Sequence, residues 1–177
     1  RGRAALHRRL LDREMFILEE FLQQHEALHR VYPHAINTLR LITLLTGGEA
    51  RVVLPPLMRF GSGGARIDAI KTVIAMVDPE SGRLRSARYN EGAPVSRHPD
   101  TGVDFATVTV PFLAEARELV EAAARGMPEV RYVGWDVALT PGGPVLIEGN
   151  GAPDPGVQQV MLLCDGRGCR DHLRSLR

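Results

Sequence analysis

The sequence predicts an α+β domain, in which a mostly antiparallel sheet is flanked by helices. Short runs of β-branched and apolar residues recur along the chain, and glycine-containing turns separate them. One longer segment, residues 111–125, instead carries apolar residues at helical spacing. No internal repeat or low-complexity segment occurs, so a single mixed domain is the expected architecture.

The composition is that of a globular protein with one core. The 177 residues are 44% apolar and 24% charged, which is ordinary for such a domain. The net charge of +1 gives no overall field that would attract nucleic acid or an anionic membrane. No apolar stretch approaches the roughly 18 residues of a membrane span, and residues 1–13 lack the apolar core of a signal peptide. We therefore expect a cytoplasmic protein with no membrane span and no nucleic-acid partner.

The N-terminal part begins with a helix and a strand. Residues 4–13 carry three leucines at helical spacing, and residues 15–18 form a short apolar run suited to a buried strand. The acidic pair Glu19-Glu20 ends that run. A polar helix is then expected at residues 23–30.

The centre of the chain is expected to form strands. Residues 38–44 form a strand that ends at a glycine turn, and residues 51–60 are its expected partner. The sequence GSGG at 61–64 forms a loop, and residues 71–77 form another strand. Residues 83–110 are rich in Gly, Pro and His, and we expect loops with short edge strands there.

The clearest helix signal follows this weak region. Pro111 opens the predicted helix, and Gly126 stops it. Its apolar positions share one face: Leu113, Ala116, Leu119, Val120 and Ala123.

Residues 131–150 predict a hairpin whose register can be computed. Pro141-Gly142-Gly143 is a three-residue loop between two β-type runs. If Thr140 faces Pro144, then Val137 faces Ile147 and Leu139 faces Val145, which makes one side of the hairpin apolar. Trp135 completes this side opposite Gly149.

The other side of the hairpin collects oxygen-bearing residues. The same register places Asp136 directly across from Glu148, with Asn150 two residues further along on that side. Two opposed carboxylates repel each other unless a cation lies nearby. An arginine or lysine could supply that cation, and so could Mg²⁺, which prefers such hard oxygen ligands. The alternative is a solvated face with separate surface charges.

The two cysteines lie in CDGRGC near the end of the chain. Cys164 and Cys169 have no second cysteine pair or nearby histidine pair to complete a zinc site. The sequence favours two reduced thiols over a metal or redox role.

Three longer segments carry a resemblance to a known family. They are LEEFLQQHEAL at 18–28, INTLRLITL at 36–44 and RYVGWDVALTPGGPVLIEGN at 131–150. Together they resemble the sugar-transfer associated ATP-grasp family, which is related to α-L-glutamate ligases. The resemblance spans about residues 18–159. It implies that residues 1–160 are the C-terminal ATP-grasp subdomain and that residues 161–177 are a tail.

The resemblance also implies roles for single residues. Asp136, Glu148 and Asn150 would hold the two Mg²⁺ ions of ATP, or Mn²⁺ in their place. The backbone of a hinge would bind adenine, with Asn37 near the ribose or phosphates and Lys71 as a substitute phosphate ligand. Arg40 and Arg59 match arginines at the phosphate and acyl-substrate site, although ordinary ion pairing would also explain them. The hinge residues are Glu19, Glu20, Phe21 and Leu22.

The chain departs from the family pattern in two places. In RIDAIKTVIAMVD at 66–78, Asp68 is retained but Ala69 follows it, and the usual glycine pair is missing. The lobe that supplies lysines and a glycine-rich flap over the phosphates does not precede residue 18. Because the chain opens on Arg1, we expect that lobe upstream, and we expect this chain alone to turn over ATP poorly.

The function implied is that of an ATP- and Mg²⁺-dependent carboxylate ligase that forms an acyl phosphate. Its partners would be ATP and a small-molecule, glycan or peptide carboxylate, as in glycan, exopolysaccharide or peptide biosynthesis. The alternative is a catalytically inactive nucleotide-binding or interaction domain. An unrelated hydrolase fits less well, because the sequence has neither a nucleophile elbow nor a Cys–His pairing signal.

Overall fold

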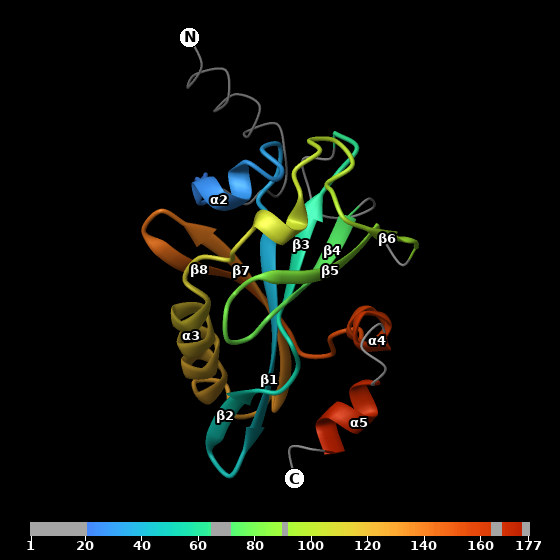
Figure 1. Cartoon of the computed structure of the whole chain (residues 1–177). Coiled ribbons are helices and arrows are strands. Elements are labelled where there is room, and N and C mark those ends of the chain that lie inside the picture. The colour runs from blue at the N-terminus through green and yellow to red at the C-terminus, as the bar shows by residue number, and fades with distance from the viewer. Residues whose placement is uncertain (1–20, 65–71, 90–91, 164–167, 175–177) are drawn as a thin grey trace, which may run out of the picture.

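The computed structural model confirms the α+β class and the antiparallel sheet (Figure 1). It describes residues 21–64, 72–89, 92–163 and 168–174. The sheet has eight strands in the order β6-β5-β4-β3-β1-β7-β8, with β2 paired to β1, and neighbouring strands run antiparallel. The strands are β1 Thr38–Thr46, β2 Glu49–Val52, β3 Leu57–Gly61, β4 Thr72–Val77, β5 Leu84–Tyr89, β6 Pro94–Val95, β7 Tyr132–Thr140 and β8 Gly143–Asn150.

The helices are few and lie around the sheet. They are α2 Glu26–His29, the 3-10 turn η1 Phe105–Thr107, α3 Leu113–Arg125, α4 Gly156–Leu163 and α5 Cys169–Arg174. The helix expected at 23–30 is shorter, because His25 caps α2 by accepting a hydrogen bond from the Ala27 N–H. The predicted α3 is confirmed, but it starts after Phe112, whose left-handed φ of 53° places Pro111 outside the helix. The helix and strand predicted for residues 4–13 and 15–18 lie outside the described residues.

Two strand predictions were wrong in detail. The partner expected at 51–60 is two strands, β2 and β3, which pair with successive parts of the same edge of β1. Pro55 and Pro56 separate them, because proline cannot donate to a ladder. The loops with short edge strands expected at 83–110 are confirmed for β6, which is a short edge strand, whereas β5 pairs with β4 and β6 and so is not an edge strand.

The two faces of the sheet carry different side chains. The α3 face bears the larger apolar cluster, which includes Leu39, Leu41 and Trp135 and is closed by Ala116 and Val120 of α3. The α4 face is apolar where Ile42, Leu57, Ile74 and Met76 pack with Met161 and Cys169. Figure 1 shows α3 on one side of β1 and β7, and α4 and α5 on the other. The boundary expected at residue 160 falls inside α4.

The β7–β8 hairpin follows the predicted register only at its open end. Asp136 pairs with Glu148 and Trp135 with Gly149, as computed. A bulge then intervenes, so Val137 pairs with Leu146 and Leu139 with Pro144. The extra residue is Ile147, which is 47% exposed instead of lying on the apolar side.

The predicted three-residue turn of this hairpin was also wrong. Thr140 pairs with Gly143, so only two residues turn the chain. The Thr140 hydroxyl closes the turn, because it donates to the Gly143 carbonyl at 2.8 Å and accepts from the Gly142 N–H at 3.2 Å. Gly143 adopts a φ of 116°, which a residue with a side chain would resist.

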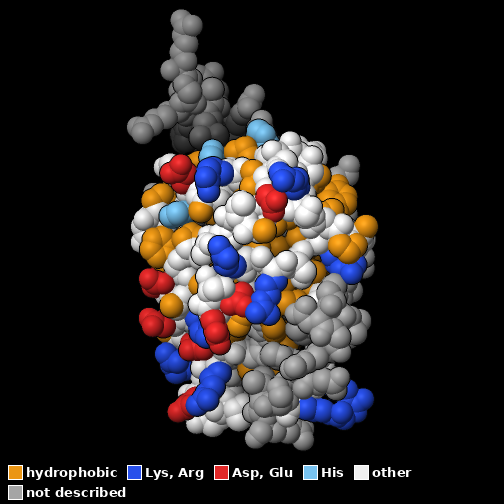
Figure 2. Space-filling view, viewed as in Figure 1, with side chains coloured by type: hydrophobic (Ala, Val, Ile, Leu, Met, Phe, Trp, Pro, Cys, Tyr) orange, Lys and Arg blue, Asp and Glu red, His pale blue; other side chains and the backbone are white. Residues whose placement is uncertain are grey.

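The described surface carries mixed charges. Figure 2 shows acidic and basic side chains interspersed over the visible face, in keeping with the net charge of +1. Among the described residues, no helix is both long and apolar enough to cross a membrane.

Candidate functional site

A buried ion pair lies at the centre of the α4 face. Arg40 of β1 and Asp136 of β7 are direct cross-strand partners. Arg40 Nε donates to Asp136 Oδ1 at 2.5 Å and Arg40 Nη2 donates to Oδ2 at 2.7 Å, a two-point contact that fixes both side chains. Their side chains are only 13% and 8% exposed. Removing two charges from water costs desolvation free energy that can exceed their attraction, so stability alone does not explain this buried pair.

Arg59 approaches the same carboxylate from β3. Its Nη1 lies 3.6 Å from Asp136 Oδ2, and its side chain is 25% exposed. The ion pairing proposed for Arg40 and Arg59 is therefore confirmed, and the two arginines supply the cations that the opposed carboxylates need. The facing acids alone thus do not require a metal.

Glu148 and Asn150 extend the site along the edge strand. Glu148 is exposed, and Asn150 Nδ2 donates to Glu148 Oε1 at 2.9 Å. This bond turns the amide so that Asn150 Oδ1, an acceptor, remains for another partner. The carboxylates of Asp136 and Glu148 with this amide oxygen form an all-oxygen donor set, which fits Mg²⁺ or Mn²⁺. Within the described ranges, no group of three or more His, Cys, Asp or Glu side chains could share a metal ion.

A cleft of about 660 Å³ lies beside the segment that leads into β1. Phe21, Leu22, Ile36 and Pro141 line it, and Phe21 is 91% exposed. Ile36 lies shortly before β1, the strand that carries Arg40.

The side chain of Asn37 makes its hydrogen bonds to other parts of the fold. It is fully buried, and its Nδ2 donates to Gln24 Oε1 at 2.8 Å and to the carbonyls of Leu28 and Tyr32. Its Oδ1 accepts from the Gly61 N–H at 3.3 Å. With its amide used in this way, Asn37 can position the segment around Gln24, and a direct nucleotide contact stays a prediction.

The loop that follows β3 is held by His98 and Asp100. His98 Nε2 bonds to the Gly61 carbonyl at 2.7 Å, and Asp100 Oδ2 accepts from the Gly63 N–H at 2.6 Å. Burial lowers the pKa of His98 from its usual value, and the Gly61 bond and the Asp100 charge oppose that change. His98 is therefore a neutral ring at neutral pH. Glu19, Glu20, Asp68 and Lys71 lie outside the described residues, and their predicted roles stay predictions.

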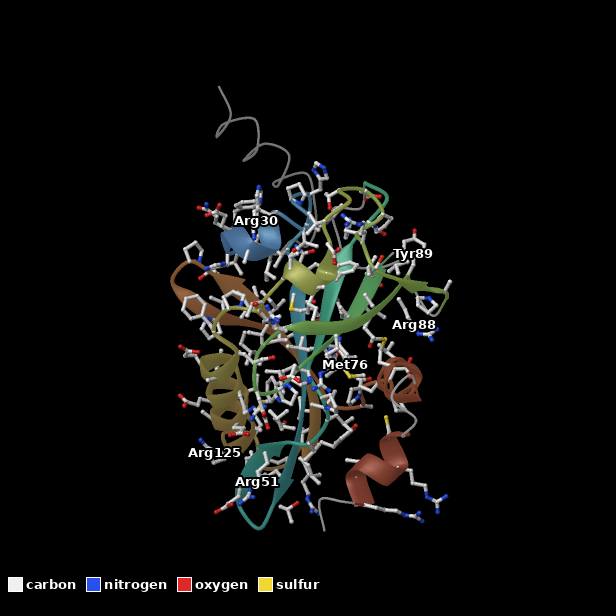
Figure 3. The ribbon with its side chains drawn as sticks, viewed as in Figure 1. Arg30, Arg51, Met76, Arg88, Tyr89 and Arg125 are labelled. Carbon is white, nitrogen blue, oxygen red and sulfur yellow. The ribbon has the colours of Figure 1, made fainter. Side chains whose placement is uncertain are left out.

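A third arginine reaches the α4 face from β5. Arg88 pairs with Ile74, which in turn pairs with Arg59, so the register places Arg88 on the same face. Its Nη1 donates to the Gly92 carbonyl at 2.9 Å. Figure 3 shows it on the β5–β6 side of the sheet, away from the β7–β8 hairpin.

In this chain an Asp on one strand faces the Glu-x-Asn sequence at the end of the next, antiparallel strand. This is the arrangement of the ATP-grasp class. The family model of the sugar-transfer associated ATP-grasp domain matches residues 5–176, and the chain belongs to that family. The match extends beyond the motif-based span of 18–159. No curated protein and no solved structure matches the chain. Membership implies an ATP-dependent, ligase-type activity, and ATP-grasp proteins typically use ATP with Mg²⁺.

Sequence reasoning missed two residues of this region. Gln24 bonds to the carbonyls of Tyr32 and Ala35 and so ties α2 to the start of β1. Thr38 lies on the same face of β1 as Arg40, two residues before it. No sequence signal marked either residue, because their neighbours are set by how the chain folds back on itself.

Proposed function

We propose that this chain belongs to an ATP- and Mg²⁺-dependent carboxylate ligase that acts through an acyl phosphate. The observation that carries the proposal is the oxygen donor set of Asp136, Glu148 and Asn150 beside two arginines on one sheet face. In such a reaction a substrate carboxylate oxygen attacks the γ-phosphorus of ATP, ADP leaves, and a nucleophile later displaces phosphate from the acyl carbon. Positioning and charge neutralisation account for most of the catalysis of this reaction.

The three oxygen-bearing residues have defined proposed roles. Glu148 would bridge two Mg²⁺ ions, Asp136 would hold one and Asn150 the other. Bound Mg²⁺ would screen the charge of the phosphates and of the transferred group. Because Asp136 already accepts two bonds from Arg40, its carboxylate is held in one orientation with lone pairs left over.

The arginines would neutralise the transferred phosphoryl group and the acyl substrate. Arg40 is fixed by Asp136, so its guanidinium needs no reorganisation when negative charge develops beside it. Arg59 contacts the pair at the longer distance of 3.6 Å and is the more exposed of the two, which suits a group that meets an incoming carboxylate.

The adenine would occupy the cleft beside Phe21 and Leu22. Backbone groups of this hinge would bind the edge of the base, and the apolar side chains would cover its faces. Ile36 of the cleft precedes β1, and Arg40 lies on that strand, so a nucleoside triphosphate with its base in the cleft would extend its phosphates along β1 toward Asp136. Glu19, Glu20 and Lys71 complete the proposed nucleotide contacts.

Titration calorimetry of ATP with Mg²⁺ tests the metal assignment in the protein as its gene encodes it. Glu148→Gln should weaken binding by tenfold or more, on the order of 1.4 kcal/mol. Asn150→Asp, which keeps an oxygen ligand, should weaken it less. Glu118→Gln, an exposed acid of α3, is the matched control and should bind as wild type does. Equal affinities for Glu148→Gln and wild type would contradict the metal site.

Hydroxylamine trapping tests the chemistry. ATP, Mg²⁺ and a panel of carboxylic acids should yield a hydroxamate from at least one acid, because hydroxylamine displaces phosphate from an acyl phosphate. Nucleotide binding without any hydroxamate would favour the non-catalytic alternative.

A further inference from the structure

The hydroxyl of Thr38 is a buried polar group whose hydrogen bonding is incomplete. Thr38 is 8% exposed, and within the described residues its Oγ1 makes no hydrogen bond. Buried hydroxyls are normally paired, and an unpaired one destabilises the fold. A bound ligand that accepts a hydrogen bond from the Thr38 hydroxyl would explain why this unpaired group is buried.

The neighbours of Thr38 are those of the candidate site. Thr38 pairs with Ala138 of β7 and with Arg59 of β3, and it is two residues from Arg40 on the same face. Two residues in the other direction is Ile36, which lines the cleft. Along the chain, Thr38 therefore lies between a residue of the cleft and Arg40, and its cross-strand partner is Arg59.

Other unpaired buried atoms do not share this location. Ser86 Oγ is on β5, which two strands separate from β1, and Arg117 Nε is on α3, which packs on the other face. Gln158 Oε1 belongs to α4, which covers the apolar end of the α4 face. Of these four, Thr38 alone lies on β1, on the face that carries Arg40.

We infer that the Thr38 hydroxyl donates a hydrogen bond to a phosphate oxygen of the bound nucleotide. The inference rests on the proposed function, since it takes the ligand from there. A phosphate is favoured over a neutral ribose hydroxyl because Arg59 directly opposes Thr38 and Arg40 follows it, so the local cations attract an anion. The contact falls on the ribose side of the phosphates that Asp136 and Glu148 would serve.

The test compares Thr38→Val with Thr38→Ser in the protein as its gene encodes it. Valine keeps the shape but removes the unpaired hydroxyl, so Tm without nucleotide should rise by roughly 2–4 °C. The Kd for ATP and for AMP should each increase about tenfold, whereas the Kd for adenosine should not change. Serine keeps the hydroxyl and should retain wild-type affinity for ATP within about twofold.

Thr43→Val is the matched control on the same strand and the opposite face. Thr43 is fully buried, but its Oγ1 accepts a hydrogen bond from Trp135 Nε1 at 2.8 Å. Thr43→Val removes this acceptor, so it should lower the Tm of the protein and leave its affinity for ATP unchanged.

The outcomes separate this inference from the function on which it rests. If Glu148→Gln weakens ATP binding while Thr38→Val binds ATP as wild type does, the Thr38 contact is wrong and the proposed site stands. An equal loss of adenosine and AMP binding in Thr38→Val would also overturn the phosphate contact, because it would place the hydroxyl at the nucleoside. If the wild-type protein binds no ATP, both proposals fail together.

Discussion

The α3 face and the α4 face are made by the same strands but differ in what they bury. On the α3 face, alternate residues such as Leu39, Leu41 and Val137 pack into one apolar cluster under α3. On the α4 face, the intervening positions hold Arg40 and Asp136, which are almost as deeply buried. An apolar face stabilises through area removed from water, whereas a buried ion pair contributes little net stability over apolar residues of similar size. The comparison shows that the α3 face is covered by one apolar cluster, whereas the α4 face combines a smaller apolar cluster with a buried ion pair.

The largest expected effect comes from breaking the ion pair. Asp136→Asn removes the charge that Arg40 and Arg59 share and leaves a cation in a site shielded from water. We expect the free energy of unfolding to fall by about 3 kcal/mol, measured by urea denaturation. Glu49→Gln is the control, because its pair with Arg51 at 2.9 Å is exposed and screened by solvent. Figure 3 shows Arg51 at the β1–β2 end of the molecule. A loss of similar size in both variants would remove the distinction between the two faces.

An intermediate effect is expected where the α3 face supports the site. A Cβ on Gly149 would lie 2.7 Å from Trp135 Cζ3, so Gly149→Ala should destabilise the fold by about 2 kcal/mol through overpacking. Because Gly149 stands between Glu148 and Asn150, Mg²⁺-dependent ATP binding should also weaken although all three proposed ligands remain. Gly142→Ala in the same hairpin, whose Cβ would meet Thr140 Oγ1 at an ordinary 3.7 Å, should change neither quantity. Denaturation and calorimetry of both variants decide this, and unchanged binding in Gly149→Ala would show that the two faces act independently.

The smallest expected effect concerns His98, which brings an ionisable ring to the α3 face. Its ring packs against Tyr32, Phe60 and Phe105, and its Nδ1 accepts from the Asp100 N–H. The pKa of His98 is lowered chiefly by burial, so below the usual value of about 6.5 the unfolded chain binds a proton that the folded chain does not. Stability is therefore complete above that pH and is lost as the pH falls, with a slope of up to about 1.4 kcal/mol per pH unit.

The His98→Gln variant isolates this contribution. Glutamine can still donate to the Gly61 carbonyl but does not titrate, so its free energy of unfolding should depend less on pH between about 7 and 5.5. The exposed histidines are present in both proteins and cancel in the difference. The charge of Asp100 acts against the shift, and removing it in Asp100→Asn should steepen the pH dependence. Parallel curves for wild type and His98→Gln would contradict a neutral buried His98.

The sequence predicted what alternation and turn residues determine. The antiparallel sheet and α3 follow from local periodicity, and the structure confirms them. The pairing of Asp136 with Glu148 is also confirmed, but only because the bulge offsets the shorter turn. The charges of Arg40 and Arg59 within apolar runs also indicated that each needs a partner. Their shared partner, Asp136, depends on the order of β3, β1 and β7 in the sheet, which no local pattern specifies.

The errors arose where side chains far apart in the sequence, or a single hydroxyl, decide the backbone. The Thr140 hydroxyl selects the two-residue turn, and that choice shifts the register between the turn and the bulge. The break between β2 and β3 had a visible cause in Pro55 and Pro56, which outweigh the apolar pattern around them. The unpaired state of Thr38 Oγ1 is a property of the folded neighbourhood and leaves no trace in the sequence.

The bulge at Ile147 divides β8 into two segments whose side chains alternate out of phase. A strand that alternates strictly would send Leu146 and Glu148 to the same face, yet Leu146 packs on the α3 side and Glu148 faces Asp136 on the other. The extra residue reverses the alternation of side chains. The segment before it therefore turns Leu146 toward the core, and the segment after it turns Glu148 toward Asp136. Deleting Ile147 would therefore force one of these two segments onto the wrong face.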